Sequence, residues 1–497
     1  MTSPRDPKRP WADDPMFGGM SDEAAEPSWR AQKLRREEEA LQEKTVFLMR
    51  PTPTAVPAVD VVTEDSAALT FRDRYEGQLL FDHDLNAWFV WDGRRWRFDK
   101  TMLAFEYARQ LARELTNGKS GKSKLITNRT SFASGVEKFA RSDRAFAVVG
   151  SEWNPDSFLL GTPNGTVNLR NGALQASVPE NRISKLTAVG PVDIANCPLW
   201  LDFLNSSTGS DQKLIRFLKQ LCGYALTGSV VEHVIAFVYG GGGNGKSVFI
   251  NTVSAIMGDY ATTAAMDTFT SSKNDKHPTE LARLRGARLV TASETEKGHA
   301  WAEARIKALT GGDRIAARLM RQDFFEFAPQ FKLIVVGNHK PTLANVDDAI
   351  KRRFKIIPFI RKPTSPDRQL EQKLKAEWPT ILRWMIDGCL DWQKDGLGQP
   401  ETVTATTEAY FDDQDLLGQW LDEKCDAEPD NPHKWDTVAA LFVSWSNYAT
   451  EAGEPPGSKK AFSEAMQSRG FHSARGGKGV RKFKGVRLIT QATHHED

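Results

Sequence analysis

Apolar and polar residues along the middle of this chain are arranged in blocks that predict strands followed by helices. The unbroken apolar run from Val234 to Tyr239 predicts a buried strand. The segment VFINTVSAIMG, which begins after Ser247, predicts a helix that ends at Gly258. Further strands are predicted at residues 288–293, 331–336 and 354–359. This alternation indicates an α/β fold for the centre of the chain.

The same patterns divide the chain into six segments. Residues 1–66 are rich in Pro, Asp, Glu and Arg and predict a disordered tail. The next segments are an N-terminal α+β domain, a helical collar, the α/β core, a helical lid, and a connector with a winged-helix domain. We place them at residues 67–205, 206–232, 233–362, 363–400 and 401–497.

In the N-terminal domain, aromatic residues flank an Asp-Gly pair and predict a hairpin over residues 88–98. Arginines between these aromatics are suited to stacking on single-stranded bases, but we favour the interpretation that the tryptophans form the core of a small domain. Two Asn-Gly turns within residues 158–175 predict a three-stranded unit. The amphipathic helix of the collar is expected to close at Gly223, with a further turn to Gly228.

Two helices separated at Pro379 are predicted for the lid. In the last segment, helices over residues 436–453 and 459–470 precede two basic strands within residues 471–489, which is a winged-helix pattern. The basic residues of this hairpin are suited to phosphate contacts, and contact with a protein is the alternative. The candidate DNA contacts are Lys478, Arg481, Lys482 and Lys484.

Composition narrows the class of protein only a little. Of the 497 residues, 40% are hydrophobic and 26% are charged, as in ordinary globular proteins. No apolar run is long enough to cross a membrane, and the N-terminus lacks the apolar core of a signal peptide. The four cysteines are scattered without a CxxC pair, which argues against a zinc site or a disulfide framework and fits a reducing cytoplasm.

A glycine-rich loop between the first core strand and its helix carries the clearest chemistry. Strand, glycine loop and helix form the context of a Walker A motif, in which backbone N–H groups cradle phosphate oxygens. Lys246 is expected to reach the β- and γ-phosphates of ATP, and Ser247 to ligate Mg²⁺. A glycine-rich turn without a ligand is the alternative. The predicted nucleotide contacts are Gly240, Gly241, Gly242, Gly243, Asn244, Gly245, Lys246 and Ser247.

Six later positions are further candidate functional residues. Glu294 ends the strand that starts at residue 288, where a carboxylate would hold Mg²⁺ and polarise the attacking water. Asn338 follows the strand at 331–336 and is placed to orient that water. The other candidates are Arg318 and Arg321 in a basic turn between two strands, and Arg352 and Arg353 before the last strand.

In order and spacing, these motifs resemble those of superfamily 3 helicases. The segments GGGGNGKS, LVTASETE, LTGGDRIAAR, LIVVGNHKP and IKRRFKIIPF carry the resemblance, which is to the helicase half of the primase-helicases of satellite phages, plasmids and poxviruses. It covers roughly residues 157–359. The resemblance implies a P-loop AAA+ core that assembles as a ring, usually a hexamer, in which each ATP is completed by an arginine from the next subunit.

By the same resemblance, Lys246 binds the nucleotide, Ser247 and Glu294 hold Mg²⁺, and Asn338 is the sensor. Arg352 or Arg353 is the finger supplied in trans, and Arg318 and Arg321 belong to a hairpin that grips DNA in the central pore. One departure concerns the acid, because Ser293 precedes Glu294 and Thr295 follows it, where many relatives have adjacent acids. The metal and base roles fall on Glu294 alone or are shared with Glu296.

The expected function is ATP-dependent DNA unwinding during replication of a phage, prophage or plasmid, in the cytoplasm of a bacterial host. No strand carries the acid pair and distal histidine of a primase, so we expect no primase activity and a partnership with a separate primase or replication initiator. Two alternatives stay open: a DNA translocase of another class, and an ATP-gated protein that binds a replication origin. Glu294 favours hydrolysis over gating alone.

Overall fold

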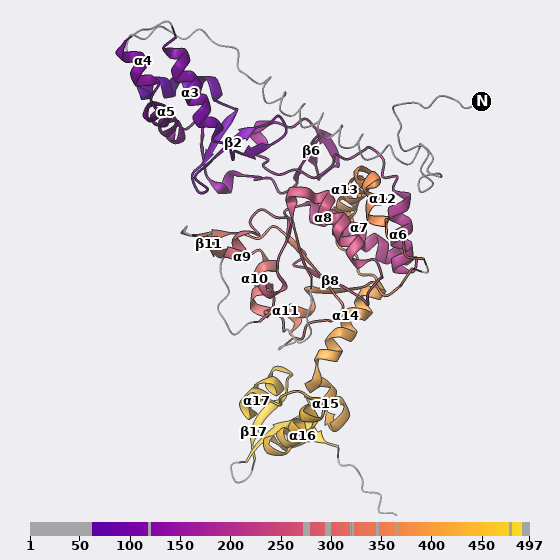
Figure 1. The fold of residues 1–497 in the computed structure, drawn as a ribbon. Helices are drawn as coiled ribbons and strands as arrows, with labels where there is room; N and C mark the ends of the chain where they lie inside the picture. Colours follow the sequence, from indigo (N-terminus) through magenta and orange to yellow (C-terminus); the bar gives the residue numbers. More distant parts are fainter. Residues whose placement is uncertain are drawn as a thin grey trace, which may run out of the picture. The chain divides into compact units, whose positions relative to one another are not determined.

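The computed structural model describes residues 62–117, 121–271, 279–293, 300–318, 320, 323–343, 347–363, 365–476 and 480–489. Internal contacts divide the chain into two units (Figure 1). The first holds the described residues up to Asp92 together with Trp96–Ser151, and the second holds Gly93–Arg95 and the described residues from Glu152 onward. The predicted N-terminal domain at 67–205 therefore contributes residues to both units.

Four helices and a four-stranded sheet form the described part of the first unit. The sheet order is β3-β2-β1-β4, and the hairpin of β2 and β3 confirms the prediction for residues 88–98. Trp88 is buried and its Nε1 donates to Glu137 Oε1 at 2.8 Å, so this tryptophan belongs to the core, as expected. The elements are α2 (Glu64–Tyr75), β1 (Leu79–Asp82), β2 (Ala87–Trp91), β3 (Trp96–Phe98), α3 (Leu103–Leu115), α4 (Lys122–Thr127), α5 (Thr130–Ser142) and β4 (Ala147–Val148).

A five-stranded parallel sheet organises the second unit and confirms the α/β class. Its order is β14-β8-β13-β10-β9, and every neighbouring pair is parallel. The strands read as continuous apolar runs because helices cover both faces of the sheet. They are β8 (Ile235–Tyr239), β9 (Ala261–Thr263), β10 (Leu289–Ser293), β13 (Lys332–Gly337) and β14 (Phe354–Pro358).

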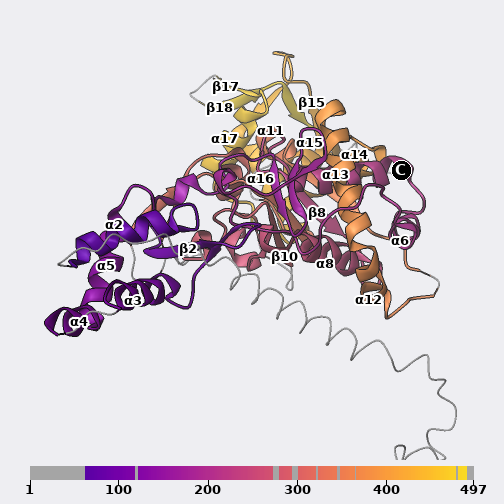
Figure 2. The same cartoon turned by 90° about the horizontal axis from the view of Figure 1, so that it is seen from above.

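Alternate side chains of these strands face two different hydrophobic clusters. Ala236 and Val238 pack with one group of helices, and Ile235 and Phe237 pack with the other. The first group is α6 (Pro198–Thr208), α7 (Gln212–Leu226), α8 (Lys246–Met257) and α13 (Trp378–Asp395), which lie together in Figure 1. Figure 2 shows α6, α8 and α13 in the right half of the view. The second includes α9 (Thr279–Ala282), α10 (Glu303–Gly311), α11 (Asp348–Lys351) and α14 (Glu401–Gln414). None of the described helices has the length and hydropathy needed to cross a membrane.

The collar helix does not close at Gly223, so that part of the prediction is wrong, whereas the further turn expected toward Gly228 is present as the last turn of the same helix. Helix α7 continues to Leu226. A Cβ atom at Gly223 would lie 2.1 Å from the backbone nitrogen of Cys389, and one at Gly388 would lie 2.1 Å from the carbonyl oxygen of Lys219. These glycines therefore allow α7 and α13 to cross with their backbones in contact. We expected Gly223 to mark the end of a helix, but glycine is needed there because α13 packs too closely for a side chain.

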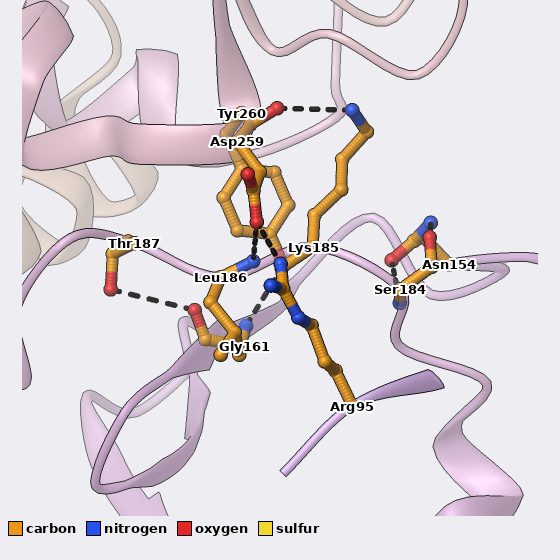
Figure 3. Close-up of polar contacts among 9 residues, drawn as sticks. All are labelled: Arg95, Asn154, Gly161, Ser184, Lys185, Leu186, Thr187, Asp259 and Tyr260. Carbon is orange, nitrogen blue, oxygen red and sulfur yellow. Dashed lines mark hydrogen bonds and ion pairs between the residues drawn. The ribbon is translucent and has the colours of Figure 1, made fainter. Parts of the chain in front are cut away.

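A small antiparallel sheet of β5 (Leu159–Thr162), β6 (Gly165–Asn168) and β7 (Ala173–Gln175) confirms the three-stranded unit predicted at 158–175. The segment after it is attached to the end of α8, as Figure 3 shows. Tyr260 Oη donates to Lys185 O at 3.0 Å and accepts from Gly161 N at 2.9 Å. Asp259 accepts from Leu186 N and pairs with Arg95. This polar network lies at the start of β9, at the amino ends of the parallel strands. The glycine loop lies at their carboxyl ends.

The lid and the terminal segment follow the predicted order of elements. The lid contains α12 (Leu370–Leu374) and α13, with Pro379 in the first turn of α13. The terminal segment has its own hydrophobic cluster and a sheet ordered β16-β18-β17. Its elements are α15 (Leu416–Lys424), β15 (Cys425–Ala427), β16 (Trp435–Thr437), α16 (Val438–Glu451), α17 (Lys459–Ser468), β17 (His472–Arg475), β18 (Arg481–Lys484) and β19 (Val486–Leu488). The predicted helices and basic hairpin are present, while the winged-helix assignment stays a prediction.

Candidate nucleotide-binding site

Close packing explains why the glycine loop begins and ends with glycine. A Cβ atom at Gly240 would lie 1.9 Å from Phe359 O. Gly245 has a φ of +88°, and a Cβ atom there would lie 2.7 Å from the ring of Phe203. Between them, the Cβ positions of Gly241, Gly242 and Gly243 face open space. The loop is therefore anchored at both ends and open in its middle, as a cradle for a ligand requires.

Lys246, the first residue of α8, is the centre of the loop's polar contacts. Its Nζ donates to Gly240 O at 2.5 Å, Gly241 O at 2.9 Å and Asn244 Oδ1 at 3.0 Å. A further bond reaches Asn338 Oδ1 at 3.1 Å. The residue is only 7% exposed, and burial lowers the pKa of its ammonium group. All four acceptors are neutral oxygens. Compared with these four contacts, an anionic ligand would be the first partner of Lys246 Nζ to carry a full negative charge.

Asn244 holds the loop in this shape. Its side chain is 2% exposed, and its Nδ2 donates to Phe359 O just beyond β14. Its Oδ1 accepts from Lys246, so one amide links the loop, the lysine and the neighbouring strand. The Asn244 amide therefore fixes Lys246 relative to the sheet. This positioning role comes in addition to the predicted contact with phosphate.

Strand register brings the tips of three strands to one edge of the sheet. Gly337 of β13 pairs with Tyr239 of β8, and Ser293 of β10 pairs with Val336 of β13. Ligands of open parallel sheets bind at this carboxyl edge. Asn338 follows β13 directly and is exposed at the edge, and Ser247 is exposed on the first turn of α8. Glu294 and Glu296 lie outside the described residues.

The two candidate finger arginines have different environments. Arg353 is 8% exposed and donates to Ala349 O at 2.6 Å and to Thr310 Oγ1 at 3.2 Å. Burial lowers its pKa, and the charge of Arg352 acts in the same direction. Arg352 is exposed at the end of α11. The structure therefore gives Arg353 an internal bonding role and leaves Arg352 facing solvent.

Neither arginine lies near the glycine loop of its own chain. Strand β14 runs parallel to β8, with Phe354 beside Ile235 and Pro358 beside Tyr239. The arginines precede β14, whereas the loop follows β8. A strand of this length spans about 16 Å. The two sites thus lie at opposite edges of one sheet, and the structure does not bring the arginines to Lys246.

The predicted basic hairpin is present as β11 (Ile315–Arg318) and β12 (Phe324–Phe327). The guanidinium of Arg318 lies 4.9 Å from the ring centroid of Phe324. Phe324 and Met320 are 63% and 71% exposed. Arg321 lies outside the described residues. The exposed apolar residues at this tip were missed by sequence reasoning, which counted only charges in the segment RLMRQDFF.

The terminal sheet carries basic and aromatic side chains together. On β18, Phe483 points into the core, and Lys482 and Lys484 lie on the other face; Arg481 is exposed at the start of the strand. Lys482 Nζ lies 4.1 Å from the ring centroid of Trp435, which is 47% exposed and pairs with Lys484. Lys478 lies outside the described residues. Trp435 was not predicted as a contact, although an aromatic residue before a helix cap could have been noted.

Two family models match this chain in succession. The first, described as D5 N terminal like, matches residues 68–209. The second, described as a family of unknown function (DUF5906), matches residues 238–353, which contain the whole glycine loop, Asn338 and both finger candidates.

Among named proteins, the chain is 26% identical over 338 residues to the putative helicase L207/L206 of Acanthamoeba polyphaga mimivirus, covering 61% of this chain and 34% of that protein. It is 24% identical over 299 residues to the putative primase C962R of African swine fever virus, covering 54% and 29% respectively. The matches thus span about a third of these relatives. A solved structure, the apo C-terminal region of NrS-1, matches with 11% identity over 85% of this chain and 99% of that one, at a TM-score of 0.48. The two family models and the viral relatives together support the predicted assignment of this chain to the superfamily 3 primase-helicases.

Proposed function

We propose that this chain is an ATP-dependent DNA helicase of replication that works as a ring of identical subunits. The observation that carries the proposal is the contact of Lys246 with Asn338 inside an anchored glycine loop. This contact brings together Lys246, which is suited to binding phosphate, and the side-chain amide of Asn338 at the end of the neighbouring strand β13. Similarity to viral proteins named putative helicases and primases supports DNA as the partner. The first helix turn and the open glycines fit a triphosphate.

In this proposal, the backbone N–H groups of Gly241–Ser247 bind the phosphates and Lys246 stabilises the charge on the terminal phosphate. Ser247 and Glu294 would hold Mg²⁺, which supplies further positive charge to the phosphate oxygens when bound. Asn338 positions the attacking water with its side-chain amide, and Asn244 keeps Lys246 directed at the loop. When a nucleotide binds, Lys246 would exchange hydrogen bonds to neutral carbonyl oxygens for a hydrogen bond to a charged phosphate oxygen. This exchange favours binding of the nucleotide.

The finger is proposed to be Arg352, acting on the nucleotide of the neighbouring subunit. Its exposure leaves it available, while Arg353 is occupied by Thr310 and Ala349. Its position at the opposite edge of the sheet from its own loop excludes a role in its own site. In comparable phosphoryl-transfer enzymes such an arginine contributes roughly 10³ to 10⁵ in rate. Hydrolysis would therefore depend on assembly, which supports a ring; a hexamer is the expected size.

Two surfaces are proposed to contact single-stranded DNA. The tip of the β11–β12 hairpin presents Arg318, Met320 and Phe324, a combination of charge and apolar surface suited to backbone and bases. The terminal sheet presents Trp435 beside Lys482. The hairpin is proposed to move with the ATPase core, and the terminal domain, which we regard as a winged helix, to hold the DNA. Priming is left to a separate primase.

An ATPase assay with and without single-stranded DNA tests this proposal against its alternatives. A helicase should hydrolyse ATP slowly alone and several times faster with DNA. Binding of ATP and DNA without turnover would favour an ATP-gated origin-binding protein. Turnover stimulated only by duplex DNA, without strand separation, would favour a translocase. Primer synthesis from ribonucleotides by the purified chain would contradict the assignment of priming to a partner.

A further inference from the structure

Helix α14 covers the open edge of the central sheet. Strand β14 is the last described strand on that side, so its outer backbone groups have no partner among the described strands. Thr407 of α14 fills one such position, because its Oγ1 accepts from Ile356 N at 2.9 Å. Phe411 packs against Phe354 with ring centroids 6.2 Å apart. The helix is therefore fixed to the sheet along its length by both polar and apolar contacts.

The same helix binds the segment that follows Asn338. Tyr410 Oη donates to Pro341 O at 2.6 Å, and Leu343 N donates to Gln414 Oε1 at 3.2 Å. Tyr410 is 1% exposed, so the donated hydrogen bond is shielded from water. Both contacts lie within five residues of Asn338. They hold the chain immediately beyond the proposed sensor.

The C-terminal end of α14 is joined to the terminal domain by an ion pair. Asp415, the residue after Gln414, accepts from Gly418 N at 3.0 Å and so caps α15. Its carboxylate also receives two hydrogen bonds from the guanidinium of Arg469, the residue after α17; one of them is 3.0 Å long. Burial opposes the charged form of Asp415, but the bonds from Arg469 and Gly418 outweigh it and hold the pKa of the carboxyl below its ordinary value. Asp415 and Arg469 therefore form a bidentate ion pair with a defined geometry.

We propose that Tyr410 and Gln414 are positioning residues for Asn338, and that the Asp415–Arg469 pair couples them to DNA bound on the terminal domain. The inference rests on the proposed ATPase function. A movement of α17 relative to the core would be transmitted through Asp415 to the end of α14, and from there to the segment after Asn338. The coupling acts on the rate of hydrolysis and not on nucleotide affinity, because α14 makes no contact with the glycine loop among the described interactions.

Tyr410→Phe tests the positioning step, since it removes one hydroxyl and keeps the ring. The loss of one hydrogen bond should lower kcat about three- to tenfold with KM within about twofold of the parent. In an Asn338→Ala background, Tyr410→Phe should have no further effect on kcat. Equal effects in both backgrounds would overturn the positioning role, because the hydroxyl would then act independently of Asn338.

Asp415→Asn tests the coupling, since asparagine keeps the helix cap but loses the charge that Arg469 requires. Basal turnover and single-stranded DNA affinity, measured by fluorescence anisotropy, should match the parent, while stimulation by DNA falls at least about threefold. Arg469→Gln should behave alike, and Arg469→Lys should recover part of the stimulation. Lys460→Gln is the matched control, because Lys460 also lies on α17 and is exposed, with its Nζ 3.8 Å from Glu464 Oε1.

Unchanged stimulation in Asp415→Asn would overturn the coupling while leaving the ATPase proposal intact. A loss of stimulation that merely follows a loss of DNA affinity would also overturn it. The proposed function itself fails differently: in that case the parent protein shows no turnover that depends on Lys246, and every variant is equally inactive.

Discussion

Lys246 Nζ lies 3.1 Å from Asn338 Oδ1, although the two residues are 92 positions apart in the sequence. The contact exists because β13 lies between β8 and β10, so that the end of β13 is beside the glycine loop. The polar group at that strand end and the lysine of the loop thus form one site. A nucleotide that draws Lys246 toward its phosphates would necessarily change the contact with Asn338.

Asn338→Ala should lower ATP turnover about 10²-fold and leave nucleotide affinity within a few fold, since the amide is proposed to act on the water and not on the bound phosphates. Steady-state hydrolysis and equilibrium binding of a fluorescent ATP analogue measure the two effects. Asn251→Ala is the control, because Asn251 lies on α8 and its exposed side chain donates to Glu371 Oε1 at 3.1 Å. Parental turnover in Asn338→Ala would contradict the sensor role.

Arg352→Ala and Lys246→Ala should each abolish turnover, but mixed rings of the two should recover part of it. In a mixed ring, some sites combine the parental lysine of one subunit with the parental arginine of the next. Hydrolysis measured across mixing ratios should therefore pass through a maximum. Mixtures that stay inactive although the subunits co-assemble would show that Arg352 does not act in trans.

Arg353→Ala should primarily affect stability. Removing its guanidinium leaves Ala349 O and Thr310 Oγ1 without a buried donor, which costs about 1–3 kcal/mol. Thermal unfolding should show a clearly lower Tm than in Arg352→Ala, whose side chain is exposed. A parental Tm in Arg353→Ala, together with lost turnover, would assign the finger to Arg353 instead.

Lys332 gives the protein a specific dependence of stability on pH. Its ammonium is buried, donates to Thr227 O at 2.5 Å and Ser229 O at 3.0 Å, and lies 4.5 Å from the ring centroid of Tyr224. Burial lowers the pKa of Lys332 well below its ordinary value, and the charge of Arg288 adds to the effect. Between that lowered pKa and about 10.4, the unfolded chain binds a proton that the folded chain does not.

The free energy of unfolding should therefore rise with pH in this window, by up to about 1.4 kcal/mol per pH unit from this group. Lys332→Met removes the group, so the difference in unfolding free energy between parent and variant should increase from pH 7 to pH 9 by denaturant titration. Lys375→Met, at an exposed position, serves as the control. A difference that stays constant with pH would show that Lys332 remains charged when buried.

The terminal sheet makes a quantitative prediction for DNA binding. If Arg481 and Lys484 each neutralise one phosphate of a single strand, replacing both by alanine should make the slope of log affinity against log salt shallower by about 1.4. Trp435→Ala should weaken binding with little change in this slope, because stacking does not release ions. An unchanged slope in the double variant would place the DNA elsewhere.

Local patterns predicted the strands, the glycine loop and the order of helices because apolar runs and turn residues report directly on burial and backbone conformation. The α/β class and the hairpins at 88–98 and 315–327 were predicted for this reason. Gly223 was misread because a helix end and a close helix crossing select the same residue. Pairings between distant residues, such as Lys246 with Asn338 and Asp415 with Arg469, depend on strand order and packing, which no local pattern contains.

The distinction between Arg352 and Arg353 could not be predicted for the same reason. Two adjacent arginines have the same local pattern, and only the position of Thr310 decides which one is buried. Expectations that concern Glu294, Arg321 and Lys478 fall outside the described residues and stay predictions, as does the location in a bacterial host.

The most direct test of the central claim is strand separation on a forked DNA substrate with ATP and Mg²⁺, run for the parent protein and for Lys246→Ala. The parent should displace the labelled strand, with no displacement when ATP is replaced by a non-hydrolysable analogue. Lys246→Ala should displace none while keeping the affinity of the parent for DNA. Absence of displacement by the assembled parent, or equal displacement by Lys246→Ala, would contradict the assignment of this chain as an ATP-driven helicase.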